Sequence, residues 1–210
     1  MSLSVRKIVI SGILGAIAIL LGVTRLGFIP VPTPAGHATI MHIPVILGGV
    51  LEGPVVGIIT GAIFGLFSFL QPGAPFFADP LVSILPRLFI GLISYLVYAL
   101  TSKTTKALGY RSASHSNKQI GKPATYGKGL NKLIEYLPLI LAGAFGSITN
   151  TTLVLGMATL RGYLPAEVSI SVGVLHGVPE LILAAILTVI LVKGIRRIRP
   201  ADNNEISTEL

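Results

Sequence analysis

Four polar side chains lie in stretches of this chain that are otherwise apolar enough to cross a membrane. They are Arg87, Asn150, His176 and Glu180. Ionisable residues at hydrocarbon depth cost at least about 2.5–3.5 kcal/mol on insertion scales, and they usually face a cavity or one another. His176 and Glu180 are four residues apart and therefore share one helix face. The pattern predicts a polar pocket shared by three spans.

Each of these groups suits the binding of a small polar molecule. Arg87 can hold a carboxylate or another polar oxygen in fork geometry, Glu180 can accept from hydroxyl or amine groups, and Asn150 offers a donor and an acceptor. Two structural alternatives stay open: an ion pair between Arg87 and Glu180, which could open on binding, and an interhelical hydrogen bond of Asn150. The candidate substrate-binding residues are Arg87, Asn150, His176, Glu180, Thr149, Tyr95, Asp79 and His37.

The motifs of several reaction classes are absent from the sequence. It has no GxxxxGK[ST] phosphate loop, no HExxH, no GxSxG and no intramembrane pair of aspartates. His37 and His42 flank a loop without a convincing third ligand, so no metal is expected. We therefore expect neither an enzyme nor a cofactor, and energy for transport must come from a partner or an ion gradient.

Composition identifies an integral membrane protein. The chain is 52% hydrophobic and only 11% charged, against about 25% charged residues in soluble domains. We predict an all-α bundle of six transmembrane helices in one domain, residues 1–200, with a polar tail at 201–210. The expected spans are 8–23, 40–51, 55–70, 81–100, 136–160 and 168–192, and residues 101–135 are expected to form a basic, partly disordered cytoplasmic linker.

The charge pattern predicts the orientation of the bundle. Thirteen of the sixteen basic residues flank the expected spans on one side, and such residues mark the cytoplasmic face. Both termini are therefore expected in the cytoplasm, and the net charge of +8 does not indicate binding to nucleic acid.

Small residues recur at helical spacing in two spans. Gly57, Gly61 and Gly65 lie four apart within the glycine-rich stretch 41–70, which predicts close helix contact in a membrane. A soluble core helix is disfavoured there, because each glycine costs about 1 kcal/mol relative to alanine. The first span contains two small-residue pairs, which serve either internal packing or docking of another membrane subunit: Gly12 with Ala16, and Ala18 with Gly22.

Two proline-rich loops are expected on the outer side. Three prolines between residues 24 and 39 exclude a helix there, and such a stiff loop suits a lid or plug over a cavity. The second loop, residues 71–80, contains Phe76 and Phe77. These two aromatic residues are either anchors at the membrane interface or a hydrophobic gate.

The chain resembles the substrate-binding S components of energy-coupling factor (ECF) vitamin transporters. The resemblance is carried by HIPVILGGVLEGPVVGIITGAIFGL (42–66), DPLVSILPRLFIGL (79–92), GSITNTTLVLG (146–156) and HGVPELILAAI (176–186). It implies a six-helix bundle whose outward-facing vitamin site is built from the outer parts of the last three spans and capped by outside loops. It also implies that Gly12, Ala16, Ala18 and Gly22 dock on a transmembrane coupling subunit, where the family has an Ala-x-x-x-Ala pattern.

That resemblance implies further partners and a ligand class. Two cytoplasmic ATPases would drive the coupling subunit, in a bacterial or archaeal cell membrane, and the S component would topple to release its ligand inside. Similar S components are assigned to pantothenate and to pyridoxine or hydroxymethylpyrimidine precursors, and Arg87 suits the carboxylate of pantothenate. The alternative function is a stand-alone proton-coupled secondary transporter with Glu180 or His176 as proton relay.

Overall fold

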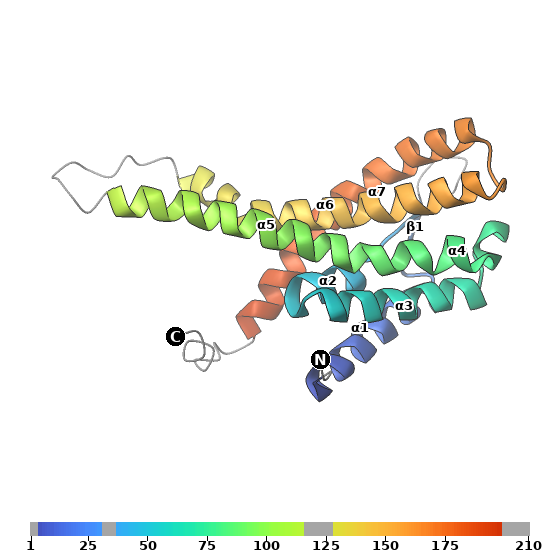
Figure 1. Ribbon diagram of the computed structural model, residues 1–210, viewed down its shortest axis with the longest axis horizontal. Helices are drawn as coiled ribbons and strands as arrows, with labels where there is room; N and C mark the ends of the chain where they lie inside the picture. Colours follow the sequence, from blue (N-terminus) through green and yellow to red (C-terminus); the bar gives the residue numbers. More distant parts are fainter. Residues whose placement is uncertain (1–3, 31–36, 116–127, 199–210) are drawn as a thin grey trace.

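The structure is a computed structural model that describes residues 4–30, 37–115 and 128–198, with residues 30, 37–38, 106–115 and 128–133 described by their backbone alone. It is a helical bundle (Figure 1), and the described part contains these elements: α1 (Val5–Val23), β1 (Phe28–Pro30), β2 (His37–Thr39), α2 (Ile43–Glu52), α3 (Pro54–Leu70), the 3₁₀ helix η1 (Pro75–Ala78), α4 (Pro80–Ser83), α5 (Leu85–His115), α6 (Lys128–Leu160) and α7 (Ala166–Ile198).

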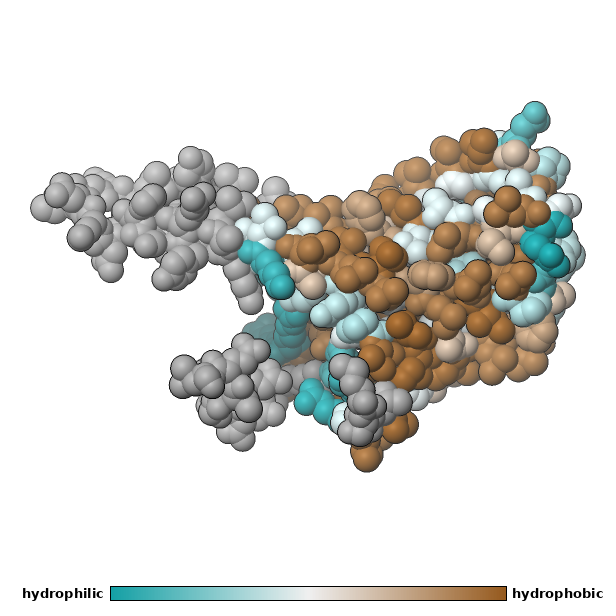
Figure 2. Space-filling model, viewed as in Figure 1, coloured by the Kyte–Doolittle hydropathy of each residue, from teal (hydrophilic) through white to brown (hydrophobic). Residues whose placement is uncertain are grey.

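The predicted all-α membrane bundle is confirmed, and each of the six expected apolar segments is helical, with the expected span 81–100 divided at Ile84 between α4 and α5. Within the described residues, four helical segments are long and apolar enough to cross a membrane: Val5–Val23, Pro80–Thr105, Ile134–Leu160 and Ala166–Ile198. Apolar side chains form a broad surface on the face of the molecule in Figure 2. The other two helices, α2 and α3, are shorter, with 10 and 17 residues. Residues 43–50 of α2 are all buried, so this helix lies within the bundle, covered by its neighbours.

The region expected to be a linker is more helical than predicted. α5 continues to His115, and α6 already begins at Lys128. These ends of α5 and α6 project from the bundle in Figure 1. The reason is that the segment after residue 100 contains no proline before Pro123, and an existing helix gains a hydrogen bond for each residue it adds. Residues 116–127 of the expected linker lie outside the described part.

The glycine stripe of α3 packs as the sequence predicts. A Cβ atom on Gly61 would lie 2.2 Å from the carbonyl oxygen of Arg87, and one on Gly57 would lie 2.8 Å from the Cα of Gly91. Further along, a Cβ on Gly65 would meet the Cα of Ile84 at 2.8 Å. α3 and the start of α5 are therefore in backbone contact, and this contact fixes the position of Arg87.

The loop between α1 and α2 contains two short strands that the sequence did not predict. β1 and β2 pair antiparallel, with Phe28 opposite Thr39 and Ile29 opposite Ala38. β2 lies against α7. Together with η1, α4 and the turn between α6 and α7, this hairpin forms one end of the bundle, which we call the loop end. The opposite end, which we call the basic end, contains Arg6, Lys193 and Arg196.

Candidate functional site

Arg87 is buried near the start of α5, with 4% of its surface exposed. Its Nη1 donates to the carbonyl oxygen of Val82 at 2.7 Å. The guanidinium lies over the ring of Phe77, 4.7 Å from its centroid, and over that of Phe64 at 5.4 Å. Aromatic faces attract such a cation, but Nε has no hydrogen-bond partner among the described residues. Arg87 is thus held in place with part of its donor capacity unused.

Glu180 on α7 is buried and connects three elements. Its Oε1 accepts from the backbone N–H of Thr39 in β2 at 2.6 Å, and its Oε2 accepts from the hydroxyl of Thr151 in α6 at 3.3 Å. No ion pair within 4.0 Å joins Glu180 to Arg87 in the described part of the chain. Glu180 therefore holds the loop hairpin against α6 and α7 rather than neutralising Arg87.

The remaining two main candidates are also buried on neighbouring helices. Asn150 lies on α6 with 9% of its surface exposed, and its Oδ1 has no hydrogen-bond partner among the described residues. His176 lies on α7 with 6% exposed, one helical turn from Glu180. Helix α6 packs against both α5 and α7. The structure thus places all four principal candidates inside the bundle, on the three helices that the sequence indicated.

Two other predicted residues, Thr149 and Tyr95, do not join this group. The Thr149 hydroxyl donates within its own helix, to the carbonyl oxygen of Phe145 at 2.7 Å. Tyr95 lies eight residues beyond Arg87 on α5, about 12 Å along the axis, and lines a cavity of about 410 Å³ at the basic end together with Arg6 and other residues. The side chain of His37 lies outside the described residues.

Thr151 is a polar contact that the sequence analysis missed. Its hydroxyl donates to Glu180, whereas the sequence predicts the nearby Thr149 as a binding residue. Ser147, Val154 and Ala158 are buried on α6. Thr151 follows Ser147 by four residues and so shares its helix face, and this spacing was the available signal.

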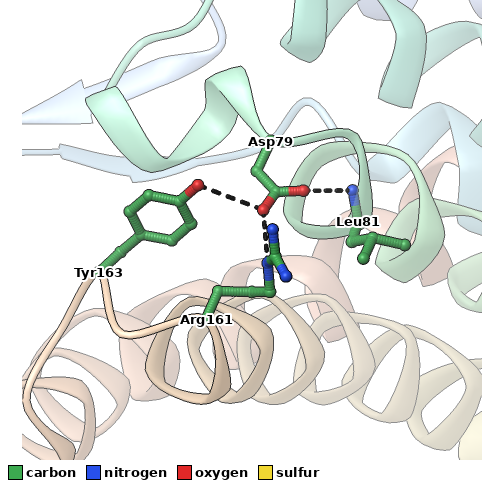
Figure 3. Close-up of polar contacts among 4 residues, drawn as sticks. All are labelled: Asp79, Leu81, Arg161 and Tyr163. Atoms are coloured by element: carbon green, nitrogen blue, oxygen red, sulfur yellow. Dashed lines mark hydrogen bonds and ion pairs between the residues drawn. The ribbon is translucent and has the colours of Figure 1, made fainter.

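Asp79, the last of the predicted residues, is the centre of a hydrogen-bonded cluster at the loop end that we call the Asp79 clasp (Figure 3). Its Oδ2 accepts from Nε of Arg161 at 2.7 Å and from the hydroxyl of Tyr163 at 3.2 Å, while Oδ1 accepts from the backbone N–H of Leu81 at 2.9 Å. The hydrogen bond from Arg161, followed by that from Leu81, holds the pKa of the Asp79 carboxyl below its usual 3.8. The clasp ties the start of α4 to the turn that follows α6.

The segment just before the clasp covers Arg87. Phe76 and Phe77 of η1 are partly buried and pack against Val82, Val154 and Ala158. The backbone carbonyl of Phe77 accepts a hydrogen bond from the Ser83 hydroxyl, while its ring lies over Arg87. These contacts give Phe77 the position of a hydrophobic cover rather than that of an anchor in the membrane interface.

A sequence model described as "ECF transporter, substrate-specific component" matches residues 6–193. The chain belongs to this family. It is therefore a multi-pass membrane protein and a substrate-binding transporter subunit, in a family that is not one of enzymes. A solved structure described as "Structure and mechanism of the S component of a bacterial ECF transporter" is 21% identical, covers 91% of this chain and 94% of that chain, and has a TM-score of 0.47. No curated protein matches the sequence.

The small-residue pairs of this S component lie on two different faces of α1. Gly12 and Ala16 are exposed, and a Cβ on Gly12 would meet nothing within 4 Å. Ala18 is fully buried, and a Cβ on Gly22 would lie 2.5 Å from the side chain of Met41. Ala18 and Gly22 therefore serve internal packing in this structure, and the Gly12/Ala16 pair remains available for a membrane partner.

Proposed function

We propose that this S component is the high-affinity vitamin-binding subunit of an ATP-driven ECF uptake transporter. It captures a small water-soluble vitamin or precursor that carries a carboxylate, with pantothenate as the best candidate. The observation that carries the proposal is the state of Arg87. A guanidinium buried to this degree without a carboxylate within ion-pair distance in the described residues is costly, and an anionic ligand would supply the missing partner.

The groups near Arg87 support a ligand with further polar atoms. The Oδ1 of Asn150 is an unused acceptor within the described part of the chain, which suits a hydroxyl or amide N–H. Glu180 already accepts from Thr39, so its carboxylate both closes the loop hairpin and borders the site. Pantothenate offers a carboxylate, two hydroxyls and an amide, which match these donors and acceptors.

The partners follow from the family and from the surface of α1. A transmembrane coupling subunit would pack on the face that contains Gly12 and Ala16, since small residues allow close backbone approach in a membrane. Two cytoplasmic ATPases would energise that subunit. The basic end, with Arg6 and Arg196, would face the cytoplasm, so the loop end and the site near it would face outward.

Mass spectrometry of small molecules that co-purify with the protein tests the ligand. We expect one carboxylate-bearing vitamin or precursor, retained by the wild type and lost from Arg87→Ala. The matched control is Arg25→Ala, which removes an exposed arginine from the turn after α1 and should keep the ligand. Equal retention by both variants would contradict the role of Arg87.

Uptake measurements test the source of energy. Cells that express the chain together with an ECF coupling subunit and ATPases should accumulate radiolabelled pantothenate, and a Walker-motif mutation in the ATPases should abolish accumulation. If cells with this chain alone accumulate the label, and if accumulation collapses with the proton gradient, the protein is a secondary transporter.

A further inference from the structure

His42 is a fully buried polar residue outside the hydrogen-bonded contacts of Arg87, Glu180 and Asp79. It lies at the start of α2 with 0% of its surface exposed, and its backbone carbonyl accepts from the N–H of Ile46 one turn further on. Neither ring nitrogen has a hydrogen-bond partner among the described residues. Buried polar groups in proteins are almost always hydrogen-bonded, so an imidazole with two unused nitrogens requires an explanation.

Contacts between α2, α5 and α6, one turn closer to the basic end than His42, place His42 beside the candidate site. A Cβ on Gly146 of α6 would lie within 3 Å of the side chains of both Ile46 in α2 and Ser94 in α5, so these three residues are at one level. His42 lies four residues before Ile46 in α2, and Asn150 lies four residues after Gly146 in α6. Both steps lead toward the loop end by about 6 Å. The two side chains therefore belong to the next level of the bundle.

Arg87 belongs to the same neighbourhood. A Cβ on Gly61 would lie 2.2 Å from the carbonyl oxygen of Arg87 and 3.3 Å from the side chain of Val45, in the first turn of α2 that His42 precedes. Arg87 Nε, Asn150 Oδ1 and both nitrogens of His42 are all without partners in the described part of the chain. Three helices thus bring together unused donors and acceptors inside the bundle.

We infer that His42 contacts the ligand and, together with Asn150, recognises a hydroxyl or amide group next to the carboxylate that Arg87 holds. An imidazole carries one donor and one acceptor nitrogen, so it can pair with a hydroxyl in either direction. The substrate class is accordingly a hydroxylated or amide-bearing carboxylic acid. This inference rests on the proposed function, because it takes the region around Arg87 as the ligand site.

The test compares variants at His42 with a control that also removes a buried, unpartnered polar atom. His42→Leu removes both nitrogens at similar volume, whereas His42→Gln and His42→Asn each retain a donor and an acceptor near one nitrogen. The control is Thr60→Val in α3. Thr60 is fully buried, its hydroxyl has no partner in the described residues, and it lies near Gly48, about two turns down α2 from His42.

Two measurements are made on each purified full-length variant: the thermal unfolding midpoint after the bound ligand has been dialysed away, and equilibrium binding of radiolabelled pantothenate. For His42→Leu we expect an unchanged or raised ligand-free midpoint and an affinity at least tenfold weaker. Either His42→Gln or His42→Asn should return the affinity to within about threefold of wild type. Thr60→Val should leave the affinity unchanged.

The inference and the proposed ligand fail in different ways. A lower ligand-free midpoint in His42→Leu, without such a fall in Thr60→Val, would show that the histidine is structural and would overturn the inference. So would equal affinities in wild type and His42→Leu. If the wild type binds no pantothenate, the proposed ligand is wrong. An unchanged or raised ligand-free unfolding midpoint of His42→Leu would still support an imidazole that is left unpaired for another ligand.

Discussion

The contact between α3 and α5 at Gly61 gives a sharp test of how the bundle positions Arg87. In Gly61→Ala, the new Cβ would lie 2.2 Å from the Arg87 carbonyl oxygen, whereas ordinary contact begins at 3.4 Å, so the helices must separate by about 1.2 Å. The obstacle is backbone, which cannot swing away as a flexible side chain can. Overpacking of this kind costs about 1–3 kcal/mol, and we expect a loss of unfolding free energy near the upper end of that range.

The same displacement should weaken ligand binding, because it moves the residue that is proposed to hold the carboxylate. The control is Gly156→Ala on α6, where the new Cβ would meet nothing within 4 Å. This control should change stability by no more than about 0.5 kcal/mol, or raise it slightly through the better helix propensity of alanine.

Unfolding of the two variants in mixed micelles, followed by circular dichroism, measures stability, and pantothenate titration measures binding. The reasoning would be refuted if Gly61→Ala were as stable as Gly156→Ala, since the backbone contact would then be too loose to position α5. If Gly61→Ala were destabilised but bound the ligand with wild-type affinity, the packing of α3 on α5 would not determine ligand binding. That result would contradict the proposed role of this contact in positioning Arg87.

Three further changes test other features. Asp79→Asn should abolish the acid sensitivity of the clasp. Because folding lowers the pKa of the Asp79 carboxyl, its contribution to stability is fully present above pH 3.8 and is lost as the pH falls through the pKa of the folded state. At those pH values the thermal unfolding midpoint of the wild type should drop relative to that of Asp79→Asn. Glu180→Ala should speed hydrogen exchange at the Thr39 amide at least tenfold, measured by mass spectrometry, with Glu180→Gln closer to wild type; equal exchange in all three proteins would argue against the contact. Ala16→Trp should block co-purification with the coupling module while ligand binding persists, whereas Ala18→Trp should lower thermal stability; assembly by Ala16→Trp would remove this face as the docking surface.

Much of the architecture could be predicted because local patterns determine it. Apolar length located the six helical segments, and the four-residue spacing of Gly57, Gly61 and Gly65 predicted a packing face that the structure confirms against α5. Buried polar residues on α5, α6 and α7 could be identified because each interrupts an apolar run. These signals need no knowledge of the tertiary partner.

Contacts that depend on a distant backbone group could not be predicted. Glu180 binds the main-chain N–H of Thr39, which is 141 residues away, and a main-chain donor leaves no trace in residue types. The two small-residue pairs of α1 look alike in sequence, but Ala18 is buried and Ala16 is exposed. Only the position of α2 and α3 against α1 distinguishes the two faces. In the sequence, His42 only pairs with His37 as a weak candidate for metal binding. Its burial depends on how α2 packs, which the sequence does not show.

The packing between α6 and α7 differs along its length, with backbone contact toward one end and side-chain contact toward the other. Toward the basic end, a Cβ on Gly143 would lie 2.7 Å from the carbonyl oxygen of Ala184, so the two backbones touch. Toward the loop end, a Cβ on Gly177 comes no closer than 3.3 Å, to the side chain of Thr151, and one on Gly173 no closer than 3.4 Å. At the loop end the turn 161–165 joins the two helices, and the hydroxyls of Thr159 and Ser169 hydrogen-bond to each other at 2.6 Å. The pair is therefore held together at both ends, so ligand entry is expected to leave α6 and α7 in contact.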